Sequence, residues 1–188
     1  TVKRYLNTAQ RDVRNLSALI DDLFQMAQLD AGGFPLRRAE ASLNDLLSDT
    51  LESFTELAKQ QELLLEGNVD SDVDPVLMDT QAIGRVLNNL IGNALRHTSN
   101  RGRVSVFVRR TTQGVELTVS DTGTGIRADD LPHIFERFYR GDAARSRSRG
   151  TGAGLGLAIA RGIVQAHGGD IKVDSEIGKG TQFTFYIP

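Results

Sequence analysis

Two asparagines one helical turn apart are the residues of this chain best suited to hold a metal-bound anion. Asn89 and Asn93 lie on one edge of a predicted helix, which carries apolar residues at helical spacing: Ile83, Val86, Leu87, Leu90, Ile91 and Ala94. A side-chain amide offers a neutral oxygen to a hard cation such as Mg²⁺, which usually shares its coordination with substrate phosphates. Arg96 follows, where it can meet a phosphate. Simple helix-surface polarity would also explain an isolated pair of asparagines.

A carboxylate follows a predicted strand further along the chain. Residues 115–120 alternate apolar and polar side chains, and the segment DTGTGI, residues 121–126, comes directly after them. The Asp121 carboxylate accepts hydrogen bonds only, which suits the exocyclic amine of adenine. Gly123 and Gly125 allow positive φ and a close approach of the backbone to a ligand. An ordinary Asp-Gly turn would have the same local sequence.

A glycine-rich segment, GTGAGLGLAIA at residues 150–160, leads into another apolar helix pattern. Free N–H groups at a helix start and the helix dipole both favour phosphate. The spacing differs from the two common phosphate-binding glycine motifs. The Rossmann motif is G-x-G-x-x-G after a strand, and the P-loop has G-K followed by Ser or Thr, whereas Lys179 is followed here by Gly180. Taken together, the three segments predict a nucleotide site.

In this order and at these separations, the segments resemble the catalytic region of bacterial sensor histidine kinases, in the ATPase superfamily shared with gyrase, Hsp90 and MutL. NNLIGNALRHT resembles the N box, DTGTGI the G1 box, FERFYR at residues 135–140 the F box, and GTGAGLGLAIA the G2 box. The C-terminal segment AHGGDIKVDSEIGKGTQFTFYIP resembles the last hairpin of that family. The resemblance implies an α+β fold of the Bergerat type, a two-layer α/β sandwich with a mixed, mostly antiparallel sheet covered by helices.

The resemblance also implies ATP and Mg²⁺ as ligands and gives each motif a role. Asn93 would coordinate Mg²⁺ with Asn89 close by, Arg96 would contact phosphate, and Asp121 would bind the adenine amine. The glycines of the G2 box would form the phosphate side of a mobile lid, and Thr181 would help to hold the base through water. The other residues implied at the pocket are His97, Gly123, Gly125, Ile126, Phe135, Gly152, Gly154, Leu155, Gly156 and Leu157.

Asn89 stands where the gyrase and Hsp90 branches have a Glu that acts as general base for water. An amide takes no proton at neutral pH, so Asn89 favours phosphoryl transfer over hydrolysis. The resemblance implies a protein-histidine kinase, which passes the γ-phosphoryl group of Mg-ATP to a histidine on a dimerisation helix. An aspartate of a response-regulator receiver domain would take it next. The alternatives are an ATPase or clamp of the gyrase and Hsp90 kind, and a regulatory binding module with a degenerate site.

The acceptor histidine is not evident in the sequence. The resembled family carries it in an H box, His followed by Glu or Asp and shortly by Pro, and this chain has no such segment. His97 lies in the predicted pocket and His133 starts a short helix after Pro132. His167 lies at a predicted helix end, where its charge would complement the helix dipole and Gly168 would form a left-handed cap.

Residues 1–31 are predicted to form a helix with a broad apolar stripe, at Leu6, Ala9, Val13, Leu16, Ile20, Leu23 and Ala27. A lone helix cannot bury such a stripe, so a helical hairpin or a second chain should cover it. The resemblance implies the second helix of a dimerisation hairpin, and hence a homodimer and a fragment that begins after the H box. An amphipathic helix folded back on its own domain is the alternative. The pattern stops at residues 31–33, which divides the chain into 1–31 and a catalytic ATP-binding domain, 32–188.

The pattern of the second domain gives its elements. An extended stretch is expected at residues 35–41, and Ser42 is predicted to cap a helix that continues through Leu57. Strands are predicted at residues 62–66, 76–78, 104–110, 115–120, 171–175 and 182–187.

Composition excludes several classes of protein. The chain has 188 residues, of which 39% are hydrophobic, no cysteine and a formal net charge of −2. The lack of cysteine excludes a disulfide scaffold and Cys-based zinc sites. No apolar run approaches membrane-spanning length, so a cytoplasmic location is expected, with the parent protein open to membrane anchoring. The basic run at residues 141–149 suits a solvated lid better than a nucleic-acid arm, because no aromatic platform accompanies it.

Overall fold

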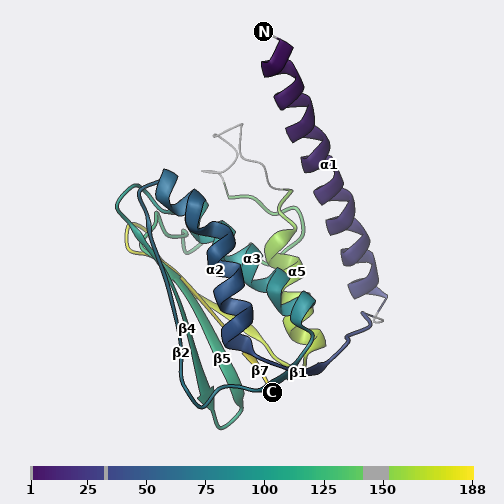
Figure 1. Cartoon of the computed structure of the whole chain (residues 1–188), viewed down its shortest axis with the longest axis vertical. Coiled ribbons are helices and arrows are strands. Elements are labelled where there is room, and N and C mark those ends of the chain that lie inside the picture. Colours follow the sequence, from purple (N-terminus) through teal and green to yellow (C-terminus); the bar gives the residue numbers. More distant parts are fainter. Residues whose placement is uncertain (1, 32–33, 142–152) are drawn as a thin grey trace.

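The computed structural model describes residues 2–31, 34–141 and 153–188. The helices are α1 (Val2–Asp30), α2 (Leu43–Gln60), α3 (Thr80–His97), the short 3₁₀ helix η1 (Leu131–His133) and α5 (Gly156–Ala166). The strands are β1 (Ala39–Ala41), β2 (Leu64–Val69), β3 (Val76–Met78), β4 (Arg103–Thr111), β5 (Gly114–Asp121), β6 (Ile171–Glu176) and β7 (Gly180–Ile187). Helices α2, α3 and α5 cover one face of the main sheet, and α1 extends beyond these layers at its N-terminal end (Figure 1).

The main sheet has the strand order β2-β4-β5-β7-β6. Strand β2 runs parallel to β4, whereas the β4-β5, β5-β7 and β6-β7 pairs are antiparallel. Strands β1 and β3 form a separate antiparallel pair. A mixed, mostly antiparallel sheet covered by helices confirms the predicted α+β two-layer α/β sandwich.

The core fills the space between the sheet and the helices. Strands β4, β5 and β7 turn alternate side chains inward, and these are almost fully buried: Val104, Val106, Val108, Val115, Leu117, Val119, Phe183, Phe185 and Ile187. Helices α3 and α5 cover them with Ile83, Val86, Leu87, Leu90, Ile91, Ile159 and Ile163. Each such side chain contributes about 1.5–3 kcal/mol on burial, so the core fixes the ends of the strands and helices where the candidate site lies. No helix among the described residues is long and apolar enough to cross a membrane.

Helix α2 begins where the sequence predicts. The Ser42 hydroxyl accepts the N–H of Asp45 at 3.0 Å and donates to Asp74 at 2.7 Å, so it caps the helix and ties it to the β3 side. Strand β2, in contrast, begins at Leu64, so the prediction of a strand at residues 62–66 was wrong at both ends. The reason is a left-handed turn at Glu62, with φ of 55°, after which Leu63 is buried.

His167 closes α5 as a buried imidazole. Its Nδ1–H donates to the Ile163 carbonyl at 2.9 Å, and its Nε2 accepts the Asp79 N–H at 3.2 Å. Burial lowers the pKa of His167 and nearby Arg38 adds to this, while the Ile163 bond and Asp79 oppose it. The ring is therefore neutral, and the expectation of a charged histidine on the helix dipole was wrong. Gly168, with φ of 86°, does form the predicted left-handed cap.

This buried imidazole should make the stability of the fold depend on pH. Below about pH 6.5 the unfolded chain takes up a proton that the folded ring resists, so the free energy of unfolding should fall as the pH falls. We expect His167→Gln to lose about 2 kcal/mol at pH 7.5 through its broken hydrogen bonds, and to fall less than the wild type between pH 7 and 5. Urea denaturation measures both. His133→Gln removes an exposed histidine and serves as the control; equal pH slopes in wild type and His167→Gln would contradict the assignment.

Helix α1 presents two different faces. Its C-terminal half packs on α5, where Leu29 lies over Gly162 and Met26 is buried. Two ion pairs flank this contact, Asp22 with Arg85 and Asp30 with Arg137. The large apolar side chains that remain exposed are Tyr5, Leu6, Val13, Leu16, Ile20, Leu23 and Phe24. The helix thus folds back on the domain without covering its predicted stripe, and the division at residue 31 stays a prediction.

Candidate nucleotide site

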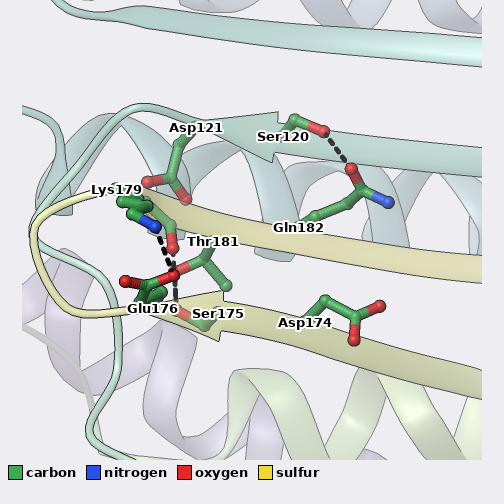
Figure 2. Close-up of a pocket in the computed structure, with 9 residues that line it drawn as sticks. Ser120, Asp121, Asp174, Ser175, Glu176, Lys179, Thr181 and Gln182 are labelled. Atoms are coloured by element: carbon green, nitrogen blue, oxygen red, sulfur yellow. Dashed lines mark hydrogen bonds and ion pairs between the residues drawn. The ribbon is translucent and has the colours of Figure 1, made fainter.

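The carboxylate at the end of β5 lies at the centre of the candidate site. Asp121 accepts the N–H of Gly123 at 2.8 Å, and the N–H of Thr181 also donates to it. Burial raises the pKa of Asp121, and the two amides oppose that rise in part. The carboxylate lies beside Thr181 of the neighbouring strand β7 (Figure 2). A partly buried acceptor at this position is what an amine donor requires.

Asp121 begins a row of polar side chains that crosses the sheet. The strand register pairs Asp121 with Thr181, and Thr181 with Ser175 of β6. The row two residues away along each strand points into the core and consists of Val119, Phe183 and Val173. Because side chains two residues apart share a face of a strand, the polar row lies on the helix-covered face, at its edge.

The loop at residues 121–126 contacts the end of α3. The N–H of Thr124 donates to the carbonyl of His97 at 3.1 Å, and Gly123 lies against that same carbonyl. The side chain of His97 is exposed at this helix end. The structure thus brings the N box and the G1 box together through backbone contacts.

The other side of this loop contacts the β6–β7 hairpin. Gly125 has φ of 69°, and a Cβ atom added there would lie 2.1 Å from the carbonyl oxygen of Glu176. A Cβ atom added at Gly180 would lie 1.9 Å from the carbonyl oxygen of Asp121. Both distances are far below van der Waals contact, so only glycine fits where the two backbones meet.

Helix α3 carries the predicted metal and phosphate ligands, and one of them, Asn89, contacts the start of α5. The Nδ2 of Asn89 donates to the Gly156 carbonyl at 3.0 Å, which directs the amide at the glycine segment. Asn93 is partly buried one turn further on. The Arg96 residue as a whole is exposed, but its guanidinium is partly desolvated. This desolvation, and then the positive charge of Arg140, lower the pKa of Arg96. An arginine remains charged at neutral pH, so an anion would stabilise this pair of cations.

The described part of the G2 box packs on the F box. The carbonyl of Gly154 accepts the N–H of Phe138 at 3.0 Å, and Leu155 is buried below it. Leu157 and Ile126 are partly buried against the core. Gly152 and the other residues between 142 and 152, including the predicted arginine-rich lid, lie outside the described residues.

Phe135, which was expected at the nucleotide pocket, packs on the core. Its ring meets Phe183 edge to face, with centroids 6.2 Å apart, and the guanidinium of Arg161 lies 5.5 Å from the Phe135 centroid. Core packing therefore accounts for one side of this ring. Its place at the pocket stays a prediction.

Two residues of this region were not predicted from the sequence as part of the site. Ser175 and Gly180 lie in the β6–β7 hairpin, where Ser175 bonds to the loop of the G1 box and Gly180 touches its first carbonyl. Period-two alternation from Val173 would have placed Ser175 on the inner face, but only the register reveals its partner Thr181. An open hollow of about 440 Å³ at this end of the sheet is lined by Asp121, Thr181 and outward-facing Asp174 and Gln182.

The fold is an α/β sandwich with the candidate nucleotide site at one end of its sheet, and comparison with known proteins identifies the family. Residues 78–188 match the family described as histidine kinase-, DNA gyrase B-, and HSP90-like ATPase. The chain belongs to this family, which confirms the resemblance seen in its motifs.

Individual relatives agree with this assignment. The chain is 40% identical to sensor histidine kinase RppB of Synechocystis sp., over 100% of this chain and 41% of the relative. It is 37% identical to sensor histidine kinase WalK of Bacillus subtilis, over 98% of this chain and 30% of the relative. Among solved structures, full-length ShkA in complex with AMPPNP matches with a TM-score of 0.86 and 31% identity, over 100% of this chain and 39% of that one. The chain thus spans less than half the length of these relatives.

Proposed function

We propose that this chain is the ATP-binding catalytic core of a sensor histidine kinase. It would transfer the γ-phosphoryl group of Mg-ATP to a histidine on a helical hairpin. The phosphoryl group would then pass to an aspartate in the receiver domain of a response regulator. The relatives named as sensor histidine kinases and the ShkA complex with AMPPNP support this proposal.

The contact of Asn89 is the observation that favours phosphoryl transfer over ATP hydrolysis. Its amide nitrogen donates to the Gly156 carbonyl, so a neutral amide oxygen is what remains for a ligand. Such an oxygen can help to hold a cation but cannot take a proton from an attacking water. The γ-phosphoryl group would therefore be transferred to a nucleophile other than water.

The residues present fit Mg²⁺ as the metal. This ion usually takes one or two protein oxygens together with phosphate oxygens and waters, and the amide oxygens of Asn93 and Asn89 suit that donor set. When bound, Mg²⁺ would neutralise phosphate charge during transfer. Arg96 would bind phosphate beside it, and Asp121 and Thr181 would hold adenine. The start of α5, with Gly154 and Gly156, would give backbone N–H groups to phosphate.

The exposed apolar face of helix α1 favours a helical partner. Its stripe of exposed apolar side chains, from Leu6 to Leu23, is broader than solvent normally faces on one helix. We infer that it forms the second helix of a dimerisation hairpin, so that residues 1–31 and 32–188 act as separate units in a homodimer. No nucleic-acid partner is proposed.

A two-stage experiment tests the proposal. Calorimetric titration with a non-hydrolysable ATP analogue, with and without Mg²⁺, measures binding. A separate helical domain that contains an H box is then added with γ-labelled ATP. We expect Mg-dependent binding and acid-labile label on the added domain, with little on the chain itself. Steady release of phosphate without label transfer would favour the ATPase alternative, and no binding would favour a regulatory module.

Two substitutions test the placement of the phosphate side. Asn93→Asp adds a negative charge beside the triphosphate, and Gly154→Ala places a Cβ atom 2.7 Å from the Tyr139 carbonyl at φ of 72°. Each is expected to weaken Mg-ATP binding about tenfold, a loss of about 1.4 kcal/mol. Gly178→Ala, in the turn of the β6–β7 hairpin, is the control for a strained alanine, because a Cβ atom there meets nothing within 4 Å. Unchanged affinity in both test variants would contradict the placement.

A further inference from the structure

Ser175 has more hydrogen-bond partners than one hydroxyl can serve by donation. Its Oγ lies 2.8 Å from the Gly180 carbonyl, 2.9 Å from the N–H of Ile126 and 3.0 Å from the Thr181 hydroxyl. A hydroxyl has one proton to donate and two lone pairs that accept. Counting protons therefore fixes the direction of each bond.

The count leaves one arrangement. The Gly180 carbonyl has no proton, so Ser175 must donate to it. The Ile126 N–H can only donate, so Ser175 accepts from it. The single proton of Ser175 is then used, and the Thr181 hydroxyl must donate to Ser175 rather than accept from it. Thr181, which is buried, keeps only lone pairs for any ligand.

This result matters because Thr181 stands beside Asp121 on the same face of the sheet (Figure 2). Asp121, when ionised, also only accepts hydrogen bonds. A purine base at this end of the sheet would thus meet two acceptors. Adenine offers an N6 amine, which donates, whereas guanine and hypoxanthine offer an O6, which accepts.

We propose that Ser175 is a positioning residue that makes the site selective for adenine over 6-oxopurines, by fixing the Thr181 hydroxyl as an acceptor. This inference rests on the proposed function, since it requires a nucleotide whose base reaches Asp121 and Thr181. Without the Ser175 hydroxyl, the Thr181 proton would be free to turn toward an O6. Ser175 acts through Thr181 and need not touch the base.

The test compares affinities for Mg-ATP and Mg-ITP by calorimetric titration of the full chain. ITP carries an oxygen at the six-position and a proton on N1, where ATP has an amine and an acceptor nitrogen, and like ATP it has no 2-amino group. We expect wild type to bind ATP more tightly than ITP. Ser175→Ala should reduce the ratio of the dissociation constant for ITP to that for ATP about tenfold, which corresponds to one hydrogen bond. Ser175→Thr keeps the hydroxyl and should restore the ratio. A purely structural role would weaken both nucleotides alike and leave the ratio unchanged.

Ser120→Ala is the matched control. Its hydroxyl lies at the same end of the sheet but bonds to Gln182 on the outer face, at 3.3 Å, so its loss should not change the ratio. If Ser175→Ala does not fold, Thr181→Val removes the acceptor directly and is expected to weaken ATP more than ITP. An unchanged ratio in folded Ser175→Ala, or equal wild-type affinity for ATP and ITP, would overturn this inference while the proposed function stands. Failure of wild type to bind ATP would overturn both.

Discussion

Asp121→Asn is expected to weaken ATP binding by about 100-fold while it raises the melting temperature at pH 7. The loss of binding follows from the two backbone amides, of Gly123 and Thr181, that donate to this side chain. An asparagine has one oxygen with two lone pairs, and both amides would occupy it. The NH₂ group would then face the adenine amine, donor against donor.

The gain in stability follows from the pKa of Asp121, which burial raises. A carboxylate with a raised pKa destabilises the fold once it ionises, so the penalty appears as the pH rises through the folded pKa and is absent at lower pH. Asparagine cannot ionise, so its advantage should exist at pH 7 and vanish near pH 3. Thermal denaturation at the two pH values and titration with an ATP analogue measure both effects.

Asp174→Asn provides the control, because Asp174 is an exposed carboxylate on the outer face of β6 at the same end of the sheet. It should change neither affinity nor stability. Unaltered ATP affinity in Asp121→Asn would contradict its contact with adenine. A lower melting temperature at pH 7 would contradict the penalty from burial.

The second large effect is expected for Gly125→Ala, a loss of about 3 kcal/mol or more of stability together with nucleotide binding. An alanine at φ of 69° is strained by about 1–2 kcal/mol, and its Cβ atom would collide with the Glu176 carbonyl. Neither backbone can move without separating the loop from the hairpin, which adds about 1–3 kcal/mol to the loss of stability. Urea denaturation and ATP titration provide the measurements.

The same hairpin contains the control for backbone strain alone. Gly178 has φ of 79°, and a Cβ atom added there would meet nothing within 4 Å. Gly178→Ala should therefore lose about 1 kcal/mol and keep its affinity for ATP. Equal destabilisation by the two substitutions would show that strain, rather than the contact with Glu176, decides the outcome.

Sequence pattern alone predicted the elements that carry strong periodicity. Helix α3 was evident because its apolar positions recur every three or four residues, and β5 because its side chains alternate up to Asp121. The cap at Ser42 followed from side-chain chemistry. Strand β2 was misplaced because its beginning depends on the backbone turn at Glu62, which propensity does not encode. The pairing of β1 with β3 depends on tertiary contact in the same way.

The candidate site likewise has parts that the sequence predicts and parts that depend on tertiary contacts. The four motifs could be recognised from the sequence, because glycine, asparagine and aspartate at fixed spacing have few other uses together, while the role of each residue stays a prediction. His167 was misread because the local sequence shows a helix end, while its neutral state depends on burial and on Asp79, 88 residues away. Ser175 was missed because a serine in a strand carries no signal until the register places it beside Thr181.

The contact between the loop at residues 121–126 and the β6–β7 hairpin has a consequence for how the sequence can vary. At Gly125 and Gly180 each glycine faces a main-chain carbonyl, so the surfaces that meet are backbone on both sides. In the core, a larger side chain at one position can be compensated by a smaller one beside it. Here no neighbouring side chain can shrink to make room. Second-site suppressors of Gly125 or Gly180 variants should therefore be absent from the hairpin, and a mutational library should tolerate only glycine at both positions.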